Sequence, residues 1–489
     1  MNKFFKISPF ILVFFLLIQS FVNPDKILAQ DKVSKIDELM SRVVDDRQFN
    51  GSILVAENGK VIYKKGFGYA NMDWKIPNKP DTKFRIGSIT KQFVAMQIMQ
   101  LVEEGKIKLD GKLVDYLPEY RDDTGEKITI HHLLTHTSGI PSYTGLPGFW
   151  TDSTRNPYEI DYMVKNFHSG DLEFEPGSSY NYNNTGYFLL AVIIEKVTGK
   201  SFKENLQERI LTPANMKNSG LDRNKEIIEN KANGYLKQLT GYMNEPYFYM
   251  LNAFGAGDMY STVEDLYLWD QALYSEKLLS KKYKDIMFTP FLNNYAYGWR
   301  VYKVALDEST DSAGVITHSG GINGFNTIIF RLVQGKHLIV LLDNTESSDL
   351  SNICNTITNI LYDKPYTLPR VSIGETIGKT ILEKDVESAI KQYHDLKNKQ
   401  ENLYNFQESE LNRLGYQLLA INKVKEAIEI FKLNVKEYPG AWNPYDSLGE
   451  AYMIYGEKEL AIQNYAKSLE LNPGNTNALI MLSRISKLN

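Results

Sequence analysis

A serine and a lysine three positions apart, Ser88 and Lys91, open a strongly helical stretch of the chain. Residues three apart on a helix share a face, so a hydroxyl and an amine would meet there. In the first helical turn, free backbone N–H groups and the helix dipole favour the negative charge that develops on a nucleophilic serine. A serine needs a base to become nucleophilic, and a lysine whose pKa is lowered by burial or by a nearby cation can supply it. The pair therefore predicts acyl transfer through Ser88.

The spacing alone does not identify a catalytic pair. Ser388 and Lys391 have the same spacing in a charged stretch without companion residues. We interpret that second pair as part of a solvated helix face. Ser88 differs from Ser388 because two further polar segments accompany it along the chain.

Tyr182 and Asn184 form the first of these companion segments. They follow a Pro-Gly pair and precede an apolar helical pattern, so we expect them in an ordered loop, where functional groups often lie. A phenolate can act as a base, and an amide can orient a lysine and a substrate carbonyl together. The same Tyr-x-Asn triplet recurs at 69–71 and 242–244. The prediction of a functional loop at 182–184 therefore depends on the preceding Pro-Gly pair and the following helix, and not on the triplet itself. The alternative is a loop that only caps the helix.

The second companion segment is Thr317-His318-Ser319-Gly320-Gly321, which precedes two strand-like runs. Glycine residues on a strand permit another backbone to approach closely. We therefore expect a substrate to lie along this edge as an added strand.

Turn residues and periodicity predict the elements that position these segments. Strand-like runs at 52–56 and 60–67 flank Asn58-Gly59, and runs at 327–333 and 337–342 flank Gln334-Gly335. Helical patterns lie between them, at 91–104, 187–198 and 261–273, the last opening with Ser261 and Glu264 at capping-box spacing. Strands at both ends with helices between them predict an α+β domain whose N- and C-terminal strands share one sheet.

The composition limits the classes of function. With 489 residues, the chain is long enough for two or three domains. Its net charge of −4 shows no sign of the basic stripe of nucleic-acid-binding proteins, and we expect no nucleic-acid partner. The single cysteine, Cys354, can form neither an internal disulfide nor a thiolate metal cage, and we expect it to be buried in a helix over 350–362.

The N-terminus has the pattern of a secretory signal. Lys3 and Lys6 precede an apolar run over 7–22, and Ala29 follows it. We expect residues 1–29 to be a signal peptide, cleaved near Ala29, and the protein to be periplasmic or secreted. The alternative is an uncleaved anchor, which would be the only membrane association.

The C-terminal part of the chain contains an internal repeat. We expect a linker with an amphipathic helix at 363–407 and repeats at 408–489. Gly415 and Gly449 are separated by 34 positions, and so are Phe431 and Tyr465. This period resembles the tetratricopeptide repeat, whose units bury their faces by stacking. The resemblance implies an α-helical array and a possible protein partner.

Taken in order, the serine–lysine, Tyr-x-Asn and His-Ser-Gly segments resemble the signature of β-lactamases and penicillin-binding proteins. With Tyr-x-Asn in second place, the chain is most similar to the class C β-lactamase type, which includes D,D-peptidases, D-aminopeptidases and esterases. Flanking segments at 130–139, 255–265 and 297–299 also resemble this family, and the resemblance covers roughly 36–362. It implies an α/β sandwich, with an antiparallel sheet flanked by helices and an all-helical subdomain, within a hydrolase domain at 31–362.

The resemblance also implies a role for each site residue. Ser88 would be acylated, and Lys91 and Tyr182 would share the general-base role. Asn184 would bind Lys91 and the substrate amide. The remaining positions would line the substrate or form the oxyanion hole: His318, Ser319 and Gly320 as substrate contacts, and the backbone N–H groups of Ser88 and Gly321 as oxyanion donors.

We expect neither a metal nor a cofactor. His132 and His136 are four apart, but the glutamate of a His-Glu-x-x-His zinc helix is missing between them. We interpret both histidines as structural.

One position departs from the β-lactamase pattern, because His318 occupies the place of a lysine. A histidine is cationic for only part of the pH range, so we hypothesise that carboxylated substrates react more slowly as the pH rises through the His318 pKa. With a histidine at this position, we rank an esterase or amidase acting on a small-molecule or peptide substrate first, a D-amino-acid peptidase second and a β-lactamase third. The alternative is a non-catalytic penicillin-binding or adaptor protein that works through its repeats.

Overall fold

The computed structural model describes residues 24–306, 311–346 and 348–487. The expected signal peptide falls outside the described residues up to position 23, and helix α2 (Pro24–Asp45) spans the expected cleavage point. Within the described ranges, none of the helices is both long and apolar enough to span a membrane. The chain forms two compact units, one running to Tyr235 and from Asn244 to Leu368, the other comprising Leu236–Met243 and the chain from Pro369 onward.

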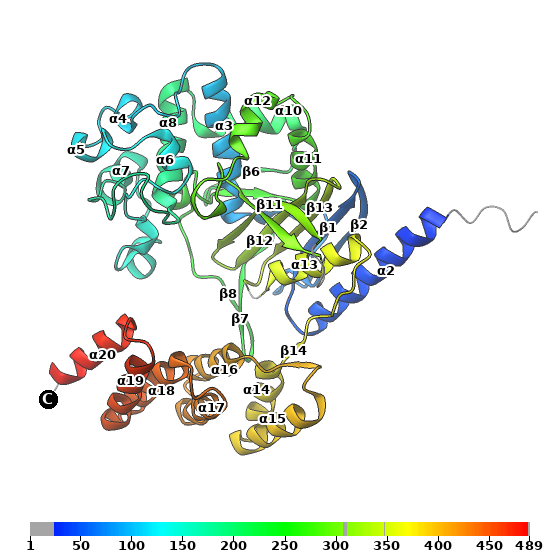
Figure 1. Ribbon diagram of the computed structural model, residues 1–489, viewed down its shortest axis with the longest axis vertical. Helices are drawn as coiled ribbons and strands as arrows, with labels where there is room; N and C mark the ends of the chain where they lie inside the picture. Colours follow the sequence, from blue (N-terminus) through cyan, green and yellow to red (C-terminus); the bar gives the residue numbers. More distant parts are fainter. Residues whose placement is uncertain (1–23, 307–310, 347, 488–489) are drawn as a thin grey trace, which may run out of the picture. The chain divides into compact units, whose positions relative to one another are not determined.

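An antiparallel six-stranded sheet organises the first unit (Figure 1). Its strands are, in spatial order, β10 (Arg300–Ala305), β11 (Ser312–Ile322), β12 (Phe325–Leu332), β13 (His337–Asp343), β1 (Gly51–Glu57) and β2 (Lys60–Phe67). Strand β1 pairs with β13, with Ile53 opposite Leu341, so the expectation that strands from both ends share one sheet is confirmed. Asn58 and Gly59 both have positive φ values, of 51° and 75°, which the tight turn of the first hairpin requires.

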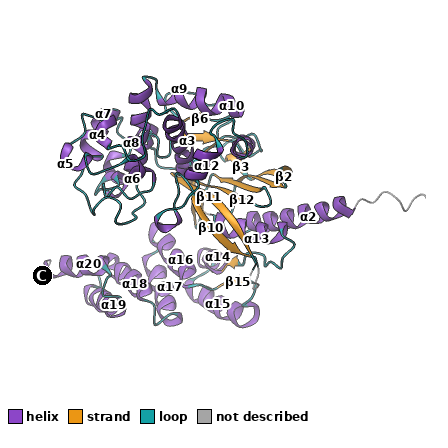
Figure 2. Ribbon diagram, turned by 45° about the horizontal axis from the view of Figure 1, so that its top comes forward, coloured by secondary structure: helices purple, strands orange, loops and turns teal. Residues whose placement is uncertain are grey.

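The two faces of the sheet belong to different cores. Successive side chains on a strand point to opposite faces. Ile53 and Leu341 pack with α2 and with α13 (Leu350–Leu361), whereas Leu54 and Val340 join the core of the helical side. Figure 2 shows helices on both sides of the sheet. Cys354 is buried and unpaired in α13, as expected.

The helical side of this unit carries most of its helices. They are α3 (Thr90–Glu103), α4 (Leu113–Tyr116), α5 (Asp122–Gly125), α6 (Ile130–Leu134), α7 (Ile160–Phe167), α8 (Asn184–Thr198), α9 (Phe202–Leu206), α10 (Thr212–Ala214), α11 (Val263–Leu273) and α12 (Lys281–Met287). The antiparallel sheet with a large helical region agrees with the expected fold class.

The expected start of α11 is wrong by one residue. Ser261 belongs to strand β9 (Met259–Ser261), and the N-cap is Thr262, whose hydroxyl accepts a hydrogen bond from the Asp265 N–H at 3.1 Å. The spacing of Ser261 and Glu264 and that of Thr262 and Asp265 both fit a capping pattern. Ser261 is not the cap, because it pairs with β5 (Phe84–Arg85) as part of β9.

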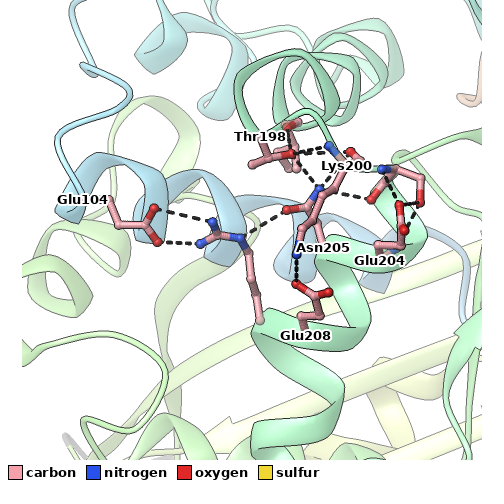
Figure 3. Close-up of polar contacts among 9 residues, drawn as sticks. Glu104, Thr198, Lys200, Glu204, Asn205 and Glu208 are labelled. Carbon is pink, nitrogen blue, oxygen red and sulfur yellow. Dashed lines mark hydrogen bonds and ion pairs between the residues drawn. The ribbon is translucent and has the colours of Figure 1, made fainter.

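Two long helices of this region, α3 and α8, are joined at their C-terminal ends (Figure 3). Asn205 on α9 is buried and donates a hydrogen bond to the Thr198 hydroxyl at the end of α8, at 2.8 Å. Its carbonyl oxygen accepts from Arg209, which forms an ion pair with Glu104 at the end of α3, at 2.6 Å. Asn205 is the buried part of this link between the two helix ends, and the Arg209–Glu104 pair lies at the surface.

A small sheet aligns the segment that precedes α3. Strand β9 lies between β5 and β6 (Gly220–Leu221). Arg85 on β5 is buried and forms ion pairs with Asp222 at 2.7 Å and Glu245 at 2.6 Å. Loss of one partner would leave an uncompensated buried charge, so these pairs constrain β5 strongly.

The second unit consists mainly of paired helices. They are α14 (Ile373–Glu383), α15 (Val386–Gln400), α16 (Glu408–Ala420), α17 (Val424–Glu437), α18 (Trp442–Tyr455), α19 (Lys458–Leu471) and α20 (Thr476–Lys487), with the short strands β14 (Val371–Ser372) and β15 (Tyr404–Asn405). The stretch expected as a linker, 363–407, thus contains two helices. Ile373, Ile377 and Ile381 recur every four residues along α14 and are buried, which draws that helix into the core of this unit.

The hairpin of β7 (Tyr235–Gln238) and β8 (Gly241–Asn244) also contributes to the second unit. Its Leu239 is buried in the same apolar core as Ile377. The second unit is therefore built from two separate stretches of the chain.

Candidate active site

Ser88 lies in a short 3-10 turn, Gly87–Ile89, that leads directly into α3. Gly87 has a φ of 49°, and a Cβ atom there would lie 2.9 Å from the backbone nitrogen of Gly321. Only glycine fits this close approach without strain. The turn is thus held against β11, and Ser88 remains partly exposed to solvent.

Lys91 is fully buried, and its amine contacts three oxygen atoms. Its Nζ lies 3.0 Å from Ser88 Oγ, 2.8 Å from Asn184 Oδ1 and 2.8 Å from the carbonyl oxygen of Ala256. Burial lowers the pKa of Lys91 well below the ordinary lysine value. A neutral amine has two N–H groups and one lone pair. It can donate to Asn184 and Ala256 while its lone pair accepts the Ser88 proton.

Tyr182 covers the same amine from the loop before α8. Its ring centroid lies 5.0 Å from Lys91 Nζ. Burial raises the pKa of the Tyr182 phenol, and the Ser88 side chain partly offsets this effect, so the two hydroxyls lie near each other. No hydrogen bond from the buried Tyr182 hydroxyl meets ordinary geometry among the described residues. Because its pKa is raised, the Tyr182 phenol is protonated at rest, whereas the pKa of Lys91 is lowered. Of the two expected bases, Lys91 is therefore the one that more readily accepts a proton.

Asn184 begins α8, after the N-cap Asn183, whose side chain accepts a hydrogen bond from the Gly186 N–H at 3.1 Å. While its Oδ1 accepts from Lys91, its Nδ2 donates to Thr144 Oγ1 at 3.0 Å. Its backbone N–H donates to Ser142 Oγ at 3.2 Å. Sequence reasoning missed both hydroxyl residues, since they lie in an irregular loop about 40 positions away.

The third segment forms a free strand edge beside Ser88. Pairing of β10 with β11 begins at Arg300 opposite Thr317, so no described strand pairs with residues 318–322 on that side. Along this edge Ser319 and Gly321 are exposed, and a Cβ atom at Gly321 would meet nothing within 4 Å. Open space beside the Gly321 backbone, next to the Ser88 turn, is what an oxyanion hole between these two residues requires.

His318 is buried, and both of its ring nitrogens have hydrogen-bond partners. Nδ1 lies 2.6 Å from the Ser319 carbonyl oxygen, to which it donates, and Nε2 lies 2.9 Å from the Tyr295 hydroxyl. Burial, reinforced by the positive charge of Arg300, lowers the pKa of His318 to about 3. The hypothesis that His318 is a titrating cation at ordinary pH is therefore wrong, because burial makes its charged form too costly.

Arg300 is a cation at this site that sequence reasoning missed. It starts β10 opposite Thr317, and its guanidinium lies 3.3 Å from the Tyr180 hydroxyl and 5.8 Å from the Tyr295 ring. Among the described residues, it has no carboxylate ion-pair partner. Burial raises the pKa of Tyr180, and the Arg300 charge partly offsets that rise. Burial lowers the pKa of His318, and the Arg300 charge adds to that effect, so its field reaches the site. Arg300 directly follows the segment 297–299, which resembles the family, and no residue pattern of its own identifies it.

His132 and His136 do not share a site. His132 Nδ1 accepts a hydrogen bond from the Thr129 N–H at 3.2 Å, whereas the His136 ring packs against Tyr182. Within the described ranges, no group of three or more His, Cys, Asp or Glu side chains could hold a metal ion.

A cavity of about 700 Å³ lies elsewhere in the helical region. It has an apolar floor that includes Leu117 and Val192 and a rim that includes Glu119 and Lys196, which pair with each other at 2.7 Å. Ser88 and Lys91 do not line it, so the chemistry described above is separate from this cavity.

Comparisons with known proteins identify the family of this chain. The Beta-lactamase family model matches residues 36–356. "Penicillin-binding protein 4*" of Bacillus subtilis (strain 168) is 33% identical over 365 residues, which cover 70% of this chain and 79% of the relative.

Solved structures show the same fold. A penicillin-binding protein homologue from Pyrococcus abyssi, described as octameric, is 30% identical with a TM-score of 0.60, over 71% of this chain and 81% of that one. A D-amino acid amidase from Ochrobactrum anthropi SV3 is 25% identical with a TM-score of 0.57, over 68% of this chain and 98% of that one. The chain thus belongs to the β-lactamase family and is a serine hydrolase related to penicillin-binding proteins and D-amino acid amidases.

Proposed function

We propose that this protein hydrolyses esters or amides through an acyl-enzyme on Ser88. One observation carries the proposal: a fully buried lysine amine lies 3.0 Å from a partly exposed serine hydroxyl. Burial lowers the pKa of that amine well below the ordinary lysine value and so favours the neutral form, which can accept the proton of an attacking serine.

In the proposed reaction, Lys91 accepts the Ser88 proton as Oγ attacks the substrate carbonyl carbon. The resulting oxyanion receives hydrogen bonds from the backbone N–H groups of Ser88 and Gly321, and one such donor typically contributes about 3–4 kcal/mol. The bond to the leaving group breaks as that group takes a proton from Lys91, relayed by the Tyr182 hydroxyl. Water then attacks the acyl-Ser88 ester by the reverse proton movements, which releases the acid and restores the serine.

The surroundings of Ser88 favour acyl compounds that carry a carboxylate. His318 is neutral, whereas Arg300 is a fixed cation without a carboxylate partner among the described residues. Similarity to a D-amino acid amidase supports amide substrates of amino acids. We rank esters and amides of small molecules first, D-amino-acid peptides second and β-lactams third.

Replacing Arg300 separates these substrate classes. In Arg300→Gln, we expect kcat/KM to fall about tenfold or more for a D-Ala-D-Ala peptide, since a charge-assisted hydrogen bond contributes about 1.5–3 kcal/mol. A neutral p-nitrophenyl ester should be hydrolysed at the wild-type rate. Equal losses for the two substrates would instead indicate general damage to the site.

Active-site labelling tests the proposal directly. Incubation with a fluorophosphonate or a labelled penicillin, followed by peptide mass spectrometry, should locate one adduct on Ser88. Ser88→Ala should abolish it, and Ser388→Ala should leave it unchanged. A folded protein that no probe modifies would support the alternative, a non-catalytic binding or adaptor protein.

The C-terminal unit and the N-terminus extend the proposal. We infer that α16–α20 are tetratricopeptide repeats with a closing helix. This is supported by one contact that recurs at the 34-residue period: the Gly415 position packs on Phe431, and the Gly449 position packs on Tyr465. We also propose export to the periplasm or the medium through residues 1–29, and a protein partner for the repeats.

A further inference from the structure

His136 makes two hydrogen bonds that bracket Tyr182. Its backbone carbonyl accepts from the Asn181 N–H at 3.0 Å, and its ring Nδ1 accepts from the Asn183 N–H at 3.1 Å. Tyr182 lies between those two donors in the chain. One residue from the segment after α6 therefore fixes the backbone on both sides of the phenol.

The His136 ring also packs against the phenol ring itself. The two ring centroids are 4.3 Å apart, and the centroid of Tyr295 lies 4.3 Å away on the same imidazole. A third tyrosine ring, Tyr187, lies at 5.2 Å. Close packing of this kind restricts the rotation of a side chain, since protein interiors have little free volume.

His136 has a conformation that only its contacts explain. Its φ is 60°, a left-handed value that non-glycine residues seldom adopt and that costs about 1–3 kcal/mol. Its Nε2 is buried without a hydrogen-bond partner among the described residues, which adds a further cost. Burial lowers the pKa of His136 well below its ordinary value, so the ring is neutral and Nδ1 stays an acceptor.

We infer that His136 is the positioning residue for Tyr182, which it holds beside Ser88 and Lys91 without contacting the reacting atoms. This inference rests on the proposed function, because it assigns a purpose to Tyr182 in acylation. It accounts for a strained, buried and partly unsatisfied residue directly behind the site.

His136→Asn tests the inference. Asparagine tolerates positive φ values and keeps a short acceptor, but it removes the ring that packs on Tyr182. We expect the rate of Ser88 acylation by a p-nitrophenyl ester to fall about 100-fold, the loss that a displacement of about 1 Å can cause. The dissociation constant of the ester, obtained from the concentration dependence of the acylation rate, should change little, because His136 does not contact the substrate.

A double-mutant cycle separates positioning from a merely structural effect. In a Tyr182→Phe background, His136→Asn should cost less than about threefold, because the hydroxyl that it positions is already absent. Full loss in both backgrounds, or a wild-type rate for His136→Asn alone, would overturn the inference. Without acylation of the wild-type protein, the proposed function itself fails and this inference with it.

His168 provides a matched control. It is also fully buried with an unpartnered Nε2, and its ring packs on Phe188 at 4.0 Å and on Tyr143 at 4.7 Å. His168→Asn should reduce thermal stability as His136→Asn does, while acylation stays within about threefold of wild type. If His168→Asn slows acylation as much as His136→Asn, general loosening of the helical region explains both and the inference is wrong.

Discussion

Two serine–lysine pairs with identical spacing occur in this chain, and the structure places them in opposite environments. Lys91 is fully buried, and its amine contacts three oxygen atoms. Lys391 is exposed on α15, and the Ser388 N–H donates to the Asp385 carboxylate at 2.7 Å, an ordinary helix cap. The buried face of α15 carries Val386, Ala389 and Tyr393 instead.

The comparison teaches that spacing supplies proximity but not reactivity. A hydroxyl and an amine share a helix face in both places. Only around Lys91 do segments distant in the chain exclude water and supply acceptors, which lowers the pKa of the amine. In the proposed function, the reactivity of the serine therefore depends on the enclosure of the pair.

Removal of each lysine should show the largest difference. We expect Lys91→Met to reduce kcat/KM for ester hydrolysis by about 10²- to 10⁴-fold, the usual contribution of a general base. Lys391→Met should leave the rate unchanged. Steady-state kinetics with a p-nitrophenyl ester measures both, and a small effect at Lys91 would show that Tyr182 alone is the base.

The contact between β11 and the turn that carries Ser88, Gly87–Ile89, should be nearly as sensitive. A Cβ atom at Gly320 would lie 2.0 Å from the Ile86 carbonyl oxygen, so Gly320→Ala must displace the backbone that leads to Ser88. We expect acylation to slow about 100-fold.

Gly314 on the same strand is a matched control for Gly320. A Cβ atom there would meet only the flexible end of the Gln334 side chain, at 2.8 Å. Gly314→Ala should acylate at the wild-type rate in the same labelling assay. A slow Gly314→Ala would mean that any change in β11 impairs the site.

The pH dependence of acylation tests the enclosure of Lys91. A lysine must be neutral to accept a proton, so the rate should rise up to tenfold per pH unit below the Lys91 pKa and then level off. Because burial lowers that pKa, the midpoint should lie well below 10.5. His318 and His136 should not contribute, since burial lowers their pKa values too and keeps both rings neutral. A midpoint near 10.5 would contradict a buried, neutral base.

Residue types and turn chemistry could predict much of the fold. Asn58-Gly59 marked its hairpin because few residue pairs accept two positive φ values. The first residue of α11 could not be predicted, since Ser261 and Thr262 both begin a plausible cap. Tertiary pairing of β9 decided between them.

The sequence allowed prediction of the site residues whose side chains contribute. It did not allow prediction of contacts made by backbone atoms or of charge states that depend on burial. Order along the chain placed Ser88, Lys91, Tyr182 and Asn184 in one group, which the structure brings together. The carbonyl oxygen of Ala256 has no residue-type signal, because every residue carries one. The charge of His318 was misjudged for a related reason, since its burial depends on the packed structure.

Thr144 should produce the smallest effect, because it acts on the lysine only through Asn184. Thr144→Val removes the acceptor for Asn184 Nδ2 while keeping the shape of the side chain. Loss of one hydrogen bond typically costs about 0.5–1.5 kcal/mol, which corresponds to a rate decrease of about two- to tenfold. Thr356→Val in α13, where a buried threonine donates to the Asn352 carbonyl at 3.0 Å, should match it in stability but retain the wild-type rate. If Thr144→Val also retains that rate, Ser88 and Ala256 suffice to orient Lys91. Fewer residues than these contacts indicate would then distinguish the Ser88–Lys91 pair from the Ser388–Lys391 pair.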